Sequence, residues 1–443
     1  MAAKESGKQL ENEARAMERP ALEAEVSPRP DAAVITRRAA ARLRAGHVWV
    51  YRSDVTALPE EAMGPEPTES VPVPSLLPVV DARGALLGTA LYSSESEIAL
   101  RLVSRDKIVD EAEWLQVLQA RMRTAIAARK GLLAGSETNA CRLIFSEADD
   151  LPGLIADKYG DLIVLQLLTK ALDNDAVRIV ATNVLKEELH PAVIVERPDA
   201  RIRELEQLSV ALDAAPLYSR GGARRDPELQ TEFLLNGLRF HYDASAGQKT
   251  GAFLDQRENY AAAARYAHGE ALDVCTYQGG FALHLARVCS RVTGVDVSRA
   301  ALEVAEKNLE ANQDRIKVEV DWVEANAFDL LKGWSQAGTL YDTIVLDPPA
   351  FAKSKRAVGG ALRGYKELNL RAMKMLRPGG VLVTCSCSHH VSLADFTTVL
   401  AAAAGDAGRR VRLIERRGAA SDHPVVLTIP ETEYLKCLIC EVE

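Results

Sequence analysis

The C-terminal part of the chain alternates apolar, strand-like runs with helical segments, and this alternation constrains the fold more than any other feature. From about Gln256 onward, five such runs are separated by segments of helical composition. Strands that alternate with helices predict a doubly wound α/β fold, a parallel sheet covered by helices on both faces. The runs are ALDVC, RVTGVDV, KVEVDWV, YDTIVLD and GVLVTCS. The segment from Tyr434 to Val442 predicts one more strand near the end.

Length and composition indicate a multidomain soluble protein. The chain has 443 residues, of which 47% are hydrophobic and 26% charged, the usual balance of globular proteins. It has no apolar run of about 18 residues, as a membrane span requires, and no apolar secretory signal, so we expect a cytoplasmic protein. Its seven cysteines are unevenly spaced and are expected to be reduced thiols. The net charge of −8 argues against binding a polyanion through bulk charge, so local basic patches would be needed.

Composition shifts divide the chain into a tail and three domains. Residues 1–32 contain almost no aromatic or β-branched residues and are expected to be a disordered tail. Residues 33–105 predict a small β domain, interrupted by a proline-rich loop between Pro59 and Pro78. Residues 106–230 predict a middle α/β domain that begins with a helix from about Asp110 to Leu133, and residues 231–443 form the third domain.

Asn236-Gly237 lies at the centre of an alternating segment, Phe233 to Tyr242, which opens the third domain. This pair is the strongest short signal for a two-residue β-hairpin. We therefore predict a hairpin between the middle and third domains.

Polar and glycine residues follow the first two predicted strands of the third domain. Ligands of open parallel sheets bind beyond the carboxyl ends of the strands, and glycines there let the backbone approach a ligand closely. Asp296 ends the second strand, where it could accept hydrogen bonds from ribose hydroxyls, and Ser298 is a plausible helix N-cap. Nicotinamide-dependent dehydrogenases use the same devices, and a strand-ending Asp can also merely cap a helix. The candidate ligand residues after the first strand are Asp273, Thr276, Gly279, Gly280 and Phe281.

Asp347-Pro348-Pro349-Ala350-Phe351 directly follows the fourth strand. Consecutive prolines stiffen a loop and keep it out of a helix. Such rigidity would fix Asp347 against a planar substrate and suits methyl transfer to a nucleobase. The alternative is an ordinary proline turn.

Several long motifs resemble one family. They are RLRAGHVWVYRSDV, FSEADDLPGLIADKYGD, TGAFLDQREN, DVCTYQGGFALHLA, DPPAFAKSK and SCSHHV, and together they cover the chain from about Val34. With these motifs the chain resembles the RlmI-like ribosomal RNA large-subunit cytosine-5 methyltransferases, which are class I S-adenosylmethionine-dependent enzymes with a Rossmann-like catalytic domain.

This resemblance implies an N-terminal PUA domain, which is an RNA-binding β-barrel, then a small α/β domain and the catalytic domain. It implies that S-adenosylmethionine is the methyl donor, that Asp273, Gly279 and Gly280 surround it, and that Asp296 holds its ribose. Asp347 would line the pocket where donor meets base. Asn326 departs from the family pattern, because an acid commonly stands there near the adenine amine.

The fifth strand ends in a pair of cysteines, Cys385 and Cys387, followed by His389. Carbon 5 of cytosine is a poor nucleophile unless a thiolate first adds to carbon 6. Strand alternation puts Cys387 at the carboxyl end of the sheet and Cys385 deeper, and the resemblance also assigns the nucleophile to Cys387. His389 could help to lower the thiol pKa. The alternative is that both cysteines are small buried core residues.

Other cysteines bear on the same mechanism. Many RNA cytosine-5 methyltransferases carry a second cysteine after the paired prolines, but this chain has Ala350 there, so the base that removes the carbon-5 proton is not identified. Cys437 and Cys440 would face opposite sides of a strand, and we interpret them as core residues, not as metal ligands. We predict no metal site.

Two basic segments are candidate RNA-binding surfaces. The first surrounds GHVWVY near the N-terminus, with Arg42 and Arg44 as its main candidates. The second follows the paired prolines, with Lys353, Lys355 and Arg356 as candidates, and continues to Arg363 and Lys366. Solvated loop charge is the alternative for both.

Two other functions remain open at this point. Asp-Pro-Pro followed by a phenylalanine is also similar to the motif of methyltransferases that modify exocyclic amino groups and need no cysteine. A non-catalytic RNA-binding protein that retains a donor fold is the other alternative. The expected partners are ribosomal RNA and S-adenosylmethionine, without a membrane, and a homodimer is one option for the assembly.

Overall fold

The computed structural model describes residues 31–59, 62, 76–208, 214–221, 229–245, 252–352 and 354–443. Most of the predicted tail, most of the proline-rich loop and Lys353 lie outside the described residues. In the described part of the chain, no helix is both long enough and apolar enough to span a membrane.

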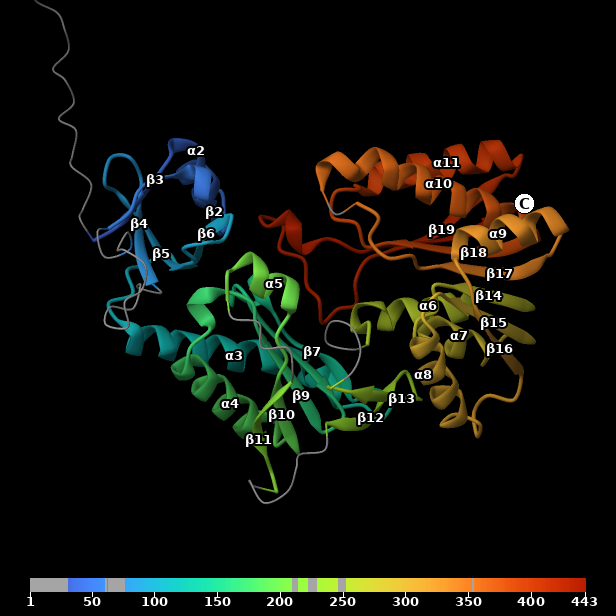
Figure 1. Ribbon diagram of the computed structural model, residues 1–443, viewed down its shortest axis with the longest axis horizontal. Coiled ribbons are helices and arrows are strands. Elements are labelled where there is room, and N and C mark those ends of the chain that lie inside the picture. The colour runs from blue at the N-terminus through green and yellow to red at the C-terminus, as the bar shows by residue number, and fades with distance from the viewer. Residues whose placement is uncertain are drawn as a thin grey trace, which may run out of the picture.

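The N-terminal sheet curls into a near-barrel (Figure 1). Its six strands follow the order β2-β6-β5-β4-β1-β3, and β1 and β4 are its parallel pair. Helix α2 (Arg37–Arg44) begins at Thr36, whose side chain accepts a hydrogen bond from the Ala39 backbone, and it buries its apolar side against the sheet core. The strands are β1 (Ala33–Ile35), β2 (Trp49–Tyr51), β3 (Val55–Ala57), β4 (Leu76–Val80), β5 (Leu86–Tyr92) and β6 (Ile98–Ser104).

The middle sheet has five strands in the order β11-β10-β9-β8-β7, of which β9 and β10 run parallel. Helices α3 and α4 pack together against it. Asp110 caps α3 by accepting a hydrogen bond from the Glu113 backbone, so the predicted helix start is confirmed to within one residue. The elements are α3 (Glu111–Leu133), β7 (Ala140–Phe145), β8 (Leu154–Tyr159), β9 (Leu162–Leu167), α4 (Asp175–Leu189), β10 (Val193–Glu196), α5 (Ala200–Leu205) and β11 (Ala215–Ser219).

The predicted hairpin forms from β12 (Gln230–Leu235) and β13 (Leu238–Asp243). Asn236 and Gly237 both have positive φ angles, of 51° and 81°, as a two-residue hairpin turn of this kind requires. The hairpin's apolar side chains join one buried cluster that includes residues of the middle sheet and of the C-terminal sheet. The hairpin therefore connects two sheets that share a continuous core.

The C-terminal sheet has seven strands in the order β16-β15-β14-β17-β18-β20-β19. The five predicted strands form its parallel part, as expected. The predicted last strand, β20, lies antiparallel between β18 and β19, and β19 was not predicted. The strands are β14 (Glu270–Val274), β15 (Arg291–Asp296), β16 (Glu319–Glu324), β17 (Tyr341–Leu346), β18 (Leu376–Ser386), β19 (Val411–Arg417) and β20 (Lys436–Val442).

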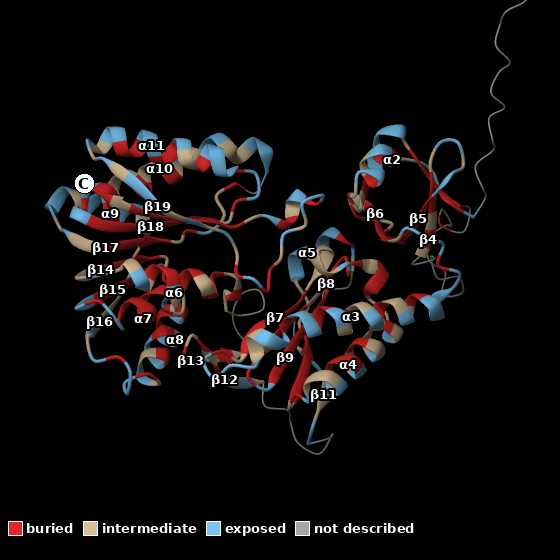
Figure 2. Ribbon diagram, turned by 180° about the vertical axis from the view of Figure 1, so that it is seen from behind, coloured by how far each residue is buried: buried red, intermediate tan, exposed pale blue. Residues whose placement is uncertain are grey.

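Helices cover both faces of the C-terminal sheet (Figures 1 and 2). Helices α6, α7 and α8 lie on one face and α9, α10 and α11 on the other, and each layer buries its own apolar cluster against the strands. This is the predicted doubly wound arrangement. The helices are α6 (Arg257–Tyr266), α7 (Gly280–Leu285), α8 (Arg299–Glu310), α9 (Ala327–Ala337), α10 (Val358–Lys374) and α11 (Leu393–Ala407).

Two polar side chains of the GHVWVY segment bond residues beyond the N-terminal sheet. Trp49 donates a hydrogen bond from Nε1 to Glu147 at 2.8 Å, and His47 lies 3.2 Å from the carboxylate of Glu431. A part of the first candidate RNA surface therefore joins the N-terminal sheet to the middle and C-terminal regions.

Candidate active site

The candidate site lies where the parallel strands of the C-terminal sheet end. Strands β14, β15, β17 and β18 run in the same direction, so their carboxyl ends share one edge. Asp296 is the last residue of β15, Asp347 follows β17 directly, and Cys387 follows β18. The parallel register thus brings together three side chains that are far apart in the sequence.

Asp273, near the end of β14, is fully buried. Its Oδ2 accepts hydrogen bonds from the Thr276 hydroxyl at 2.5 Å and from the Ala282 backbone at 2.9 Å, while Oδ1 has no hydrogen-bond partner within the described chain. Burial raises the pKa of Asp273 to about 7, although these hydrogen bonds oppose the change. A buried carboxylate oxygen without a partner fits a site that receives a ligand with a hydrogen-bond donor, as S-adenosylmethionine would.

The loop after β14 has an unusual backbone. Cys275, Tyr277 and Gly279 have φ angles of 65°, 52° and 83°, and a non-glycine residue pays an energetic cost for this conformation. Gly280 opens α7 against the Tyr260 ring, where a Cβ atom would lie 2.5 Å from it. Phe281 is buried and packs edge-on against the same ring, so its side chain supports the loop from within.

Asp296 ties together the two loops beside it. Its Oδ2 accepts from the Tyr277 backbone and its Oδ1 from the Ser298 backbone, both at 2.9 Å. Each carboxylate oxygen has a second lone pair, so the side chain could still accept hydrogen bonds from ribose hydroxyls. Ser298 caps α8, as predicted.

Asn326, the departure from the family pattern, caps α9. Its side-chain oxygen accepts hydrogen bonds from the backbone of Phe328 at 2.9 Å and of Asp329 at 3.4 Å. Because this oxygen already bonds the start of α9, the Asn326 amide nitrogen would donate a hydrogen bond to an adenine, whereas a carboxylate at this position could only accept one.

Asp347 is held by a residue that sequence reasoning did not assign. Gln256 donates from Nε2 to Asp347 Oδ2 at 3.0 Å and accepts from Asn259 at 2.6 Å, and Arg417 in turn donates to Asn259. Gln256 belongs to the TGAFLDQREN motif, which was the one signal that could have found it.

Cys387 lies against the paired-proline loop, with Sγ 4.0 Å from the carbonyl oxygen of Pro348. On either side of it, Ser386 and Ser388 both bond the buried Tyr365 hydroxyl, at 3.0 Å and 2.9 Å. Ser388 also accepts from the Ala352 backbone. This network joins the end of β18 to the paired-proline loop and holds the partly exposed Cys387 between them.

Cys385 differs from Cys387 as strand alternation predicts. It is fully buried and pairs across the strands with Cys437, and Cys440 is also buried. The interaction with Cys437, together with burial, holds the pKa of Cys385 well above its usual range, so its thiol is a poor nucleophile.

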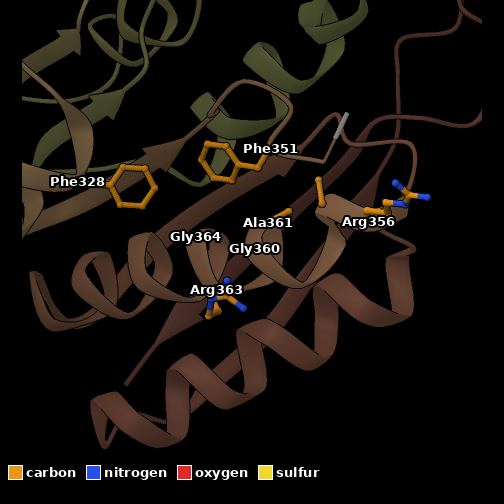
Figure 3. Close-up of a pocket in the computed structure, with 8 residues that line it drawn as sticks. Phe328, Phe351, Arg356, Gly360, Ala361, Arg363 and Gly364 are labelled. Atoms are coloured by element: carbon orange, nitrogen blue, oxygen red, sulfur yellow. The ribbon is translucent and has the colours of Figure 1, made fainter. Parts of the chain in front are cut away.

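A pocket of about 490 Å³ opens beside the paired-proline loop, between the start of α9 and α10 (Figure 3). Phe328 and Phe351 form its aromatic wall, and Arg356 and Arg363 supply positive charge. Arg356, Arg363 and the neighbouring Lys355 are exposed, and in the described part of the chain none of them forms an ion pair. The remaining lining residues are Ala357, Gly360, Ala361 and Gly364.

The first basic segment is bound within the protein instead. Arg42 donates to the carboxylate of Asp54 at 3.2 Å and to the Trp49 carbonyl, and Arg44 pairs with Asp81 at 2.5 Å. Arg42 is about one-quarter exposed, whereas Arg44 is about half exposed. The two candidates therefore differ in how freely they could reach a phosphate.

Known proteins match both ends of the chain. Residues 222–437 match the S-adenosylmethionine-dependent methyltransferase family and residues 34–105 match the PUA-like domain. A solved structure of a candidate methyltransferase complexed with SAH covers 92% of this chain and 99% of its own, with a TM-score of 0.74 and 19% identity, which supports the fold.

Two curated relatives are both named ribosomal RNA large subunit methyltransferase I. The protein from Pseudoalteromonas translucida is 38% identical over 82% of this chain and 89% of its own. The protein from Photobacterium profundum is 35% identical over 90% of this chain and 96% of its own. With its S-adenosylmethionine-dependent methyltransferase domain and PUA-like domain, the chain belongs to the ribosomal RNA large subunit methyltransferase I family.

Proposed function

We propose that this protein transfers a methyl group from S-adenosylmethionine to carbon 5 of a cytosine in large-subunit ribosomal RNA. The observation that carries the proposal is the position of Cys387, 4.0 Å from the Pro348 carbonyl and at the edge where the donor loops converge. The relatives' names support ribosomal RNA as the substrate.

The roles of the side chains follow from the chemistry. Cys387, as a thiolate, adds to carbon 6 of the cytosine, and the electron pair of the broken double bond makes carbon 5 nucleophilic. S-adenosylmethionine supplies the electrophilic methyl group to that carbon. When carbon 5 then loses its proton to a base, the double bond forms again and the thiolate leaves. Asp347, oriented by Gln256, would accept from the polar edge of the cytosine.

The proposed contacts to S-adenosylmethionine are Asp273, Thr276, Gly279, Gly280 and Asp296. Thr276 would act through Asp273, to which its hydroxyl is bonded. Phe281 would support the loop after β14, because its side chain is buried. Asn326 would donate a hydrogen bond from its amide nitrogen, because its oxygen caps α9.

The pocket of Figure 3 and its basic rim are the proposed path for the RNA backbone. Lys355 and Arg356 precede α10 beside the paired-proline loop and lack carboxylate partners in the described chain, so their charge is available to phosphates. Lys353 lies outside the described residues and stays a candidate from the sequence alone. Arg44 is a second candidate, and Arg42 a weaker one because Asp54 holds it.

The amino-group alternative has less support. A methyltransferase acting on an exocyclic amine needs no thiol beside the paired prolines, whereas here a partly exposed thiol lies there, and Tyr365 bonds the two serines that flank it. A non-catalytic RNA-binding protein would need neither the thiol nor the donor loops.

The proposal is tested by Cys387→Ala with Cys385→Ala as the matched control. Cys387→Ala should abolish methyl transfer to ribosomal RNA without changing donor affinity, and Cys385→Ala should retain most activity. RNA carrying 5-fluorocytosine at the target should trap the wild-type enzyme covalently, because fluorine cannot leave as a proton does. Methylation by Cys387→Ala, or a methyl group found on an amino nitrogen, would overturn the proposal in favour of the amino-group mechanism.

We further propose that the protein acts in the cytoplasm, where ribosomal RNA would be available to it. A homodimer is a separate proposal, and sedimentation velocity over a range of protein concentrations distinguishes it from a monomer.

A further inference from the structure

Lys436 is a buried lysine beside Cys387. Strand β20 pairs with β18 so that Lys436 lies opposite Ser386, the residue before Cys387. The residue is 6% exposed, and its Nζ donates to the carbonyl oxygens of Ser388 at 2.7 Å and of Tyr434 at 2.8 Å. Burying an ammonium group is costly unless its charge is compensated.

The two hydrogen-bond partners of Lys436 do not compensate its charge. Both are neutral carbonyl oxygens, and an ammonium group has three N–H bonds to donate. In the part of the chain that the structure describes, no carboxylate lies within ion-pair distance of Lys436. Glu433 lies beyond that distance, and its charge raises the pKa of Lys436. Burial lowers the pKa of Lys436 to about 8, and negative charge on Cys387 opposes this change. Lys436 and the thiolate of Cys387 thus carry opposite charges in a site that is largely shielded from water.

Three other titratable side chains near Cys387 are uncharged at neutral pH, whereas Asp347, which precedes Pro348, and Asp255, which accepts from Tyr434, place carboxyl groups in the same region. Burial raises the pKa of Tyr365 on α10 and of Tyr434 before β20, so both remain phenols. Loss of contact with water, together with the charges of Lys436 and His390, lowers the pKa of His389 below 6.5. His389 is therefore neutral and does not supply the positive charge expected of it from the sequence.

We propose that Lys436 is a positioning residue whose ammonium group stabilises the thiolate form of Cys387. The inference rests on the proposed function only in assigning the nucleophile to Cys387. The S–H bond of Cys387 breaks, the proton passes to water at the partly exposed site, and the electron pair stays on sulfur. The nearby ammonium charge then offsets the charge of the thiolate. No oxidant or further reactant takes part.

The test measures thiolate formation without any RNA. Iodoacetamide alkylates thiolates, and mass spectrometry of peptides follows Cys387 separately from the six other cysteines across a pH series. Lys436→Met should move the alkylation profile of Cys387 to higher pH. At pH 7 its alkylation should be slower by about tenfold, since a shift of one pKa unit changes the thiolate fraction by that factor. Lys436→Arg, which keeps a positive charge, should restore most of the rate.

Two control variants separate this role from general disturbance. Lys332→Met removes an exposed lysine on α9 and should leave the Cys387 profile unchanged. His389→Gln should also leave it unchanged, because that imidazole is neutral. A Lys436→Met profile that superimposes on wild type overturns the proposal, and so does a shift seen with His389→Gln alone.

A reciprocal measurement covers the case in which Lys436→Met does not fold. Coupling between two groups acts equally in both directions. In protein labelled with ¹³C-lysine, the NMR titration of Lys436 should therefore move to lower pH in Cys387→Ala than in wild type. Equal titration midpoints overturn the proposal. Neither measurement uses methyl transfer, so failure of the cytosine mechanism would appear only in the RNA assay and is distinguishable from failure of this inference.

Discussion

Asp422 and Arg257 form a buried salt bridge with an Nη2–Oδ1 distance of 3.0 Å. Arg257 begins α6, and Asp422 lies in the segment between β19 and β20. Asp422 also accepts from the Arg142 backbone of the middle sheet at 2.9 Å, and its carbonyl accepts from Arg129 of α3 at 3.0 Å. One aspartate thus joins α6, the middle sheet and α3.

We expect Asp422→Ala to lower the free energy of unfolding by about 3–5 kcal/mol, because it leaves the buried Arg257 with only its longer contact of 3.4 Å to Glu258. Chemical denaturation measures this change. Asp321→Ala, which breaks an exposed pair with Arg291, is the matched control and should cost at most about 1 kcal/mol. Similar losses in both variants would contradict a special role for Asp422.

Asp273 should make the unliganded protein less stable as pH rises. Its folded-state pKa is about 7, above the unfolded value, so its contribution to stability is complete at low pH and is lost as pH rises through 7. Relative to Asp273→Asn, wild type should therefore lose up to a few kcal/mol between about pH 4 and pH 8, at roughly 1.4 kcal/mol per pKa unit. Denaturation over this pH range measures the difference. Saturating S-adenosylmethionine should reduce it if the ligand donates to Oδ1, and parallel pH profiles for the two proteins would refute the prediction.

Asp296→Ala should weaken S-adenosylmethionine binding by about 1–3 kcal/mol through loss of charge-assisted hydrogen bonds. Calorimetric titration measures the affinity. The carboxylate also holds the backbones of Tyr277 and Ser298, so the unliganded variant's melting temperature should be compared with that of Ser298→Ala, which loses only a helix cap. Donor affinity equal to wild type would show that Asp296 has a structural role alone.

Neutralising the basic rim of the pocket should weaken RNA binding and its salt dependence. The double variant Lys355→Gln/Arg356→Gln removes charges without carboxylate partners in the described chain, so the slope of log affinity against log salt should fall by about 1–2. Filter binding across a salt series measures this slope. Arg44→Gln tests the N-terminal surface separately. Arg42→Gln should chiefly reduce stability, because it deprives the buried Asp54 of a partner. An unchanged slope in the double variant would mean that these residues are only solvated surface.

The sequence by itself determined the doubly wound C-terminal fold. The apolar runs and intervening helices repeat along the chain, and parallel strands joined by helices have few arrangements open to them. Local signals worked for the same reason: the Asn236-Gly237 hairpin and the caps Asp110 and Ser298 depend on residues close in sequence. Strand alternation also distinguished Cys387 from Cys385.

Tertiary structure alone decided the side-chain partners. Gln256 reaches Asp347 across 91 positions, and Lys436 reaches the Ser388 carbonyl across 48, so no local pattern could reveal either contact. Strand β19 was missed because its side chains are largely exposed and it lacks the apolar run of its neighbours. From the sequence, His389 was the candidate for lowering the thiol pKa of Cys387, whereas we propose Lys436 for this role. Protonation depends on burial and neighbouring charge, which only the folded chain determines.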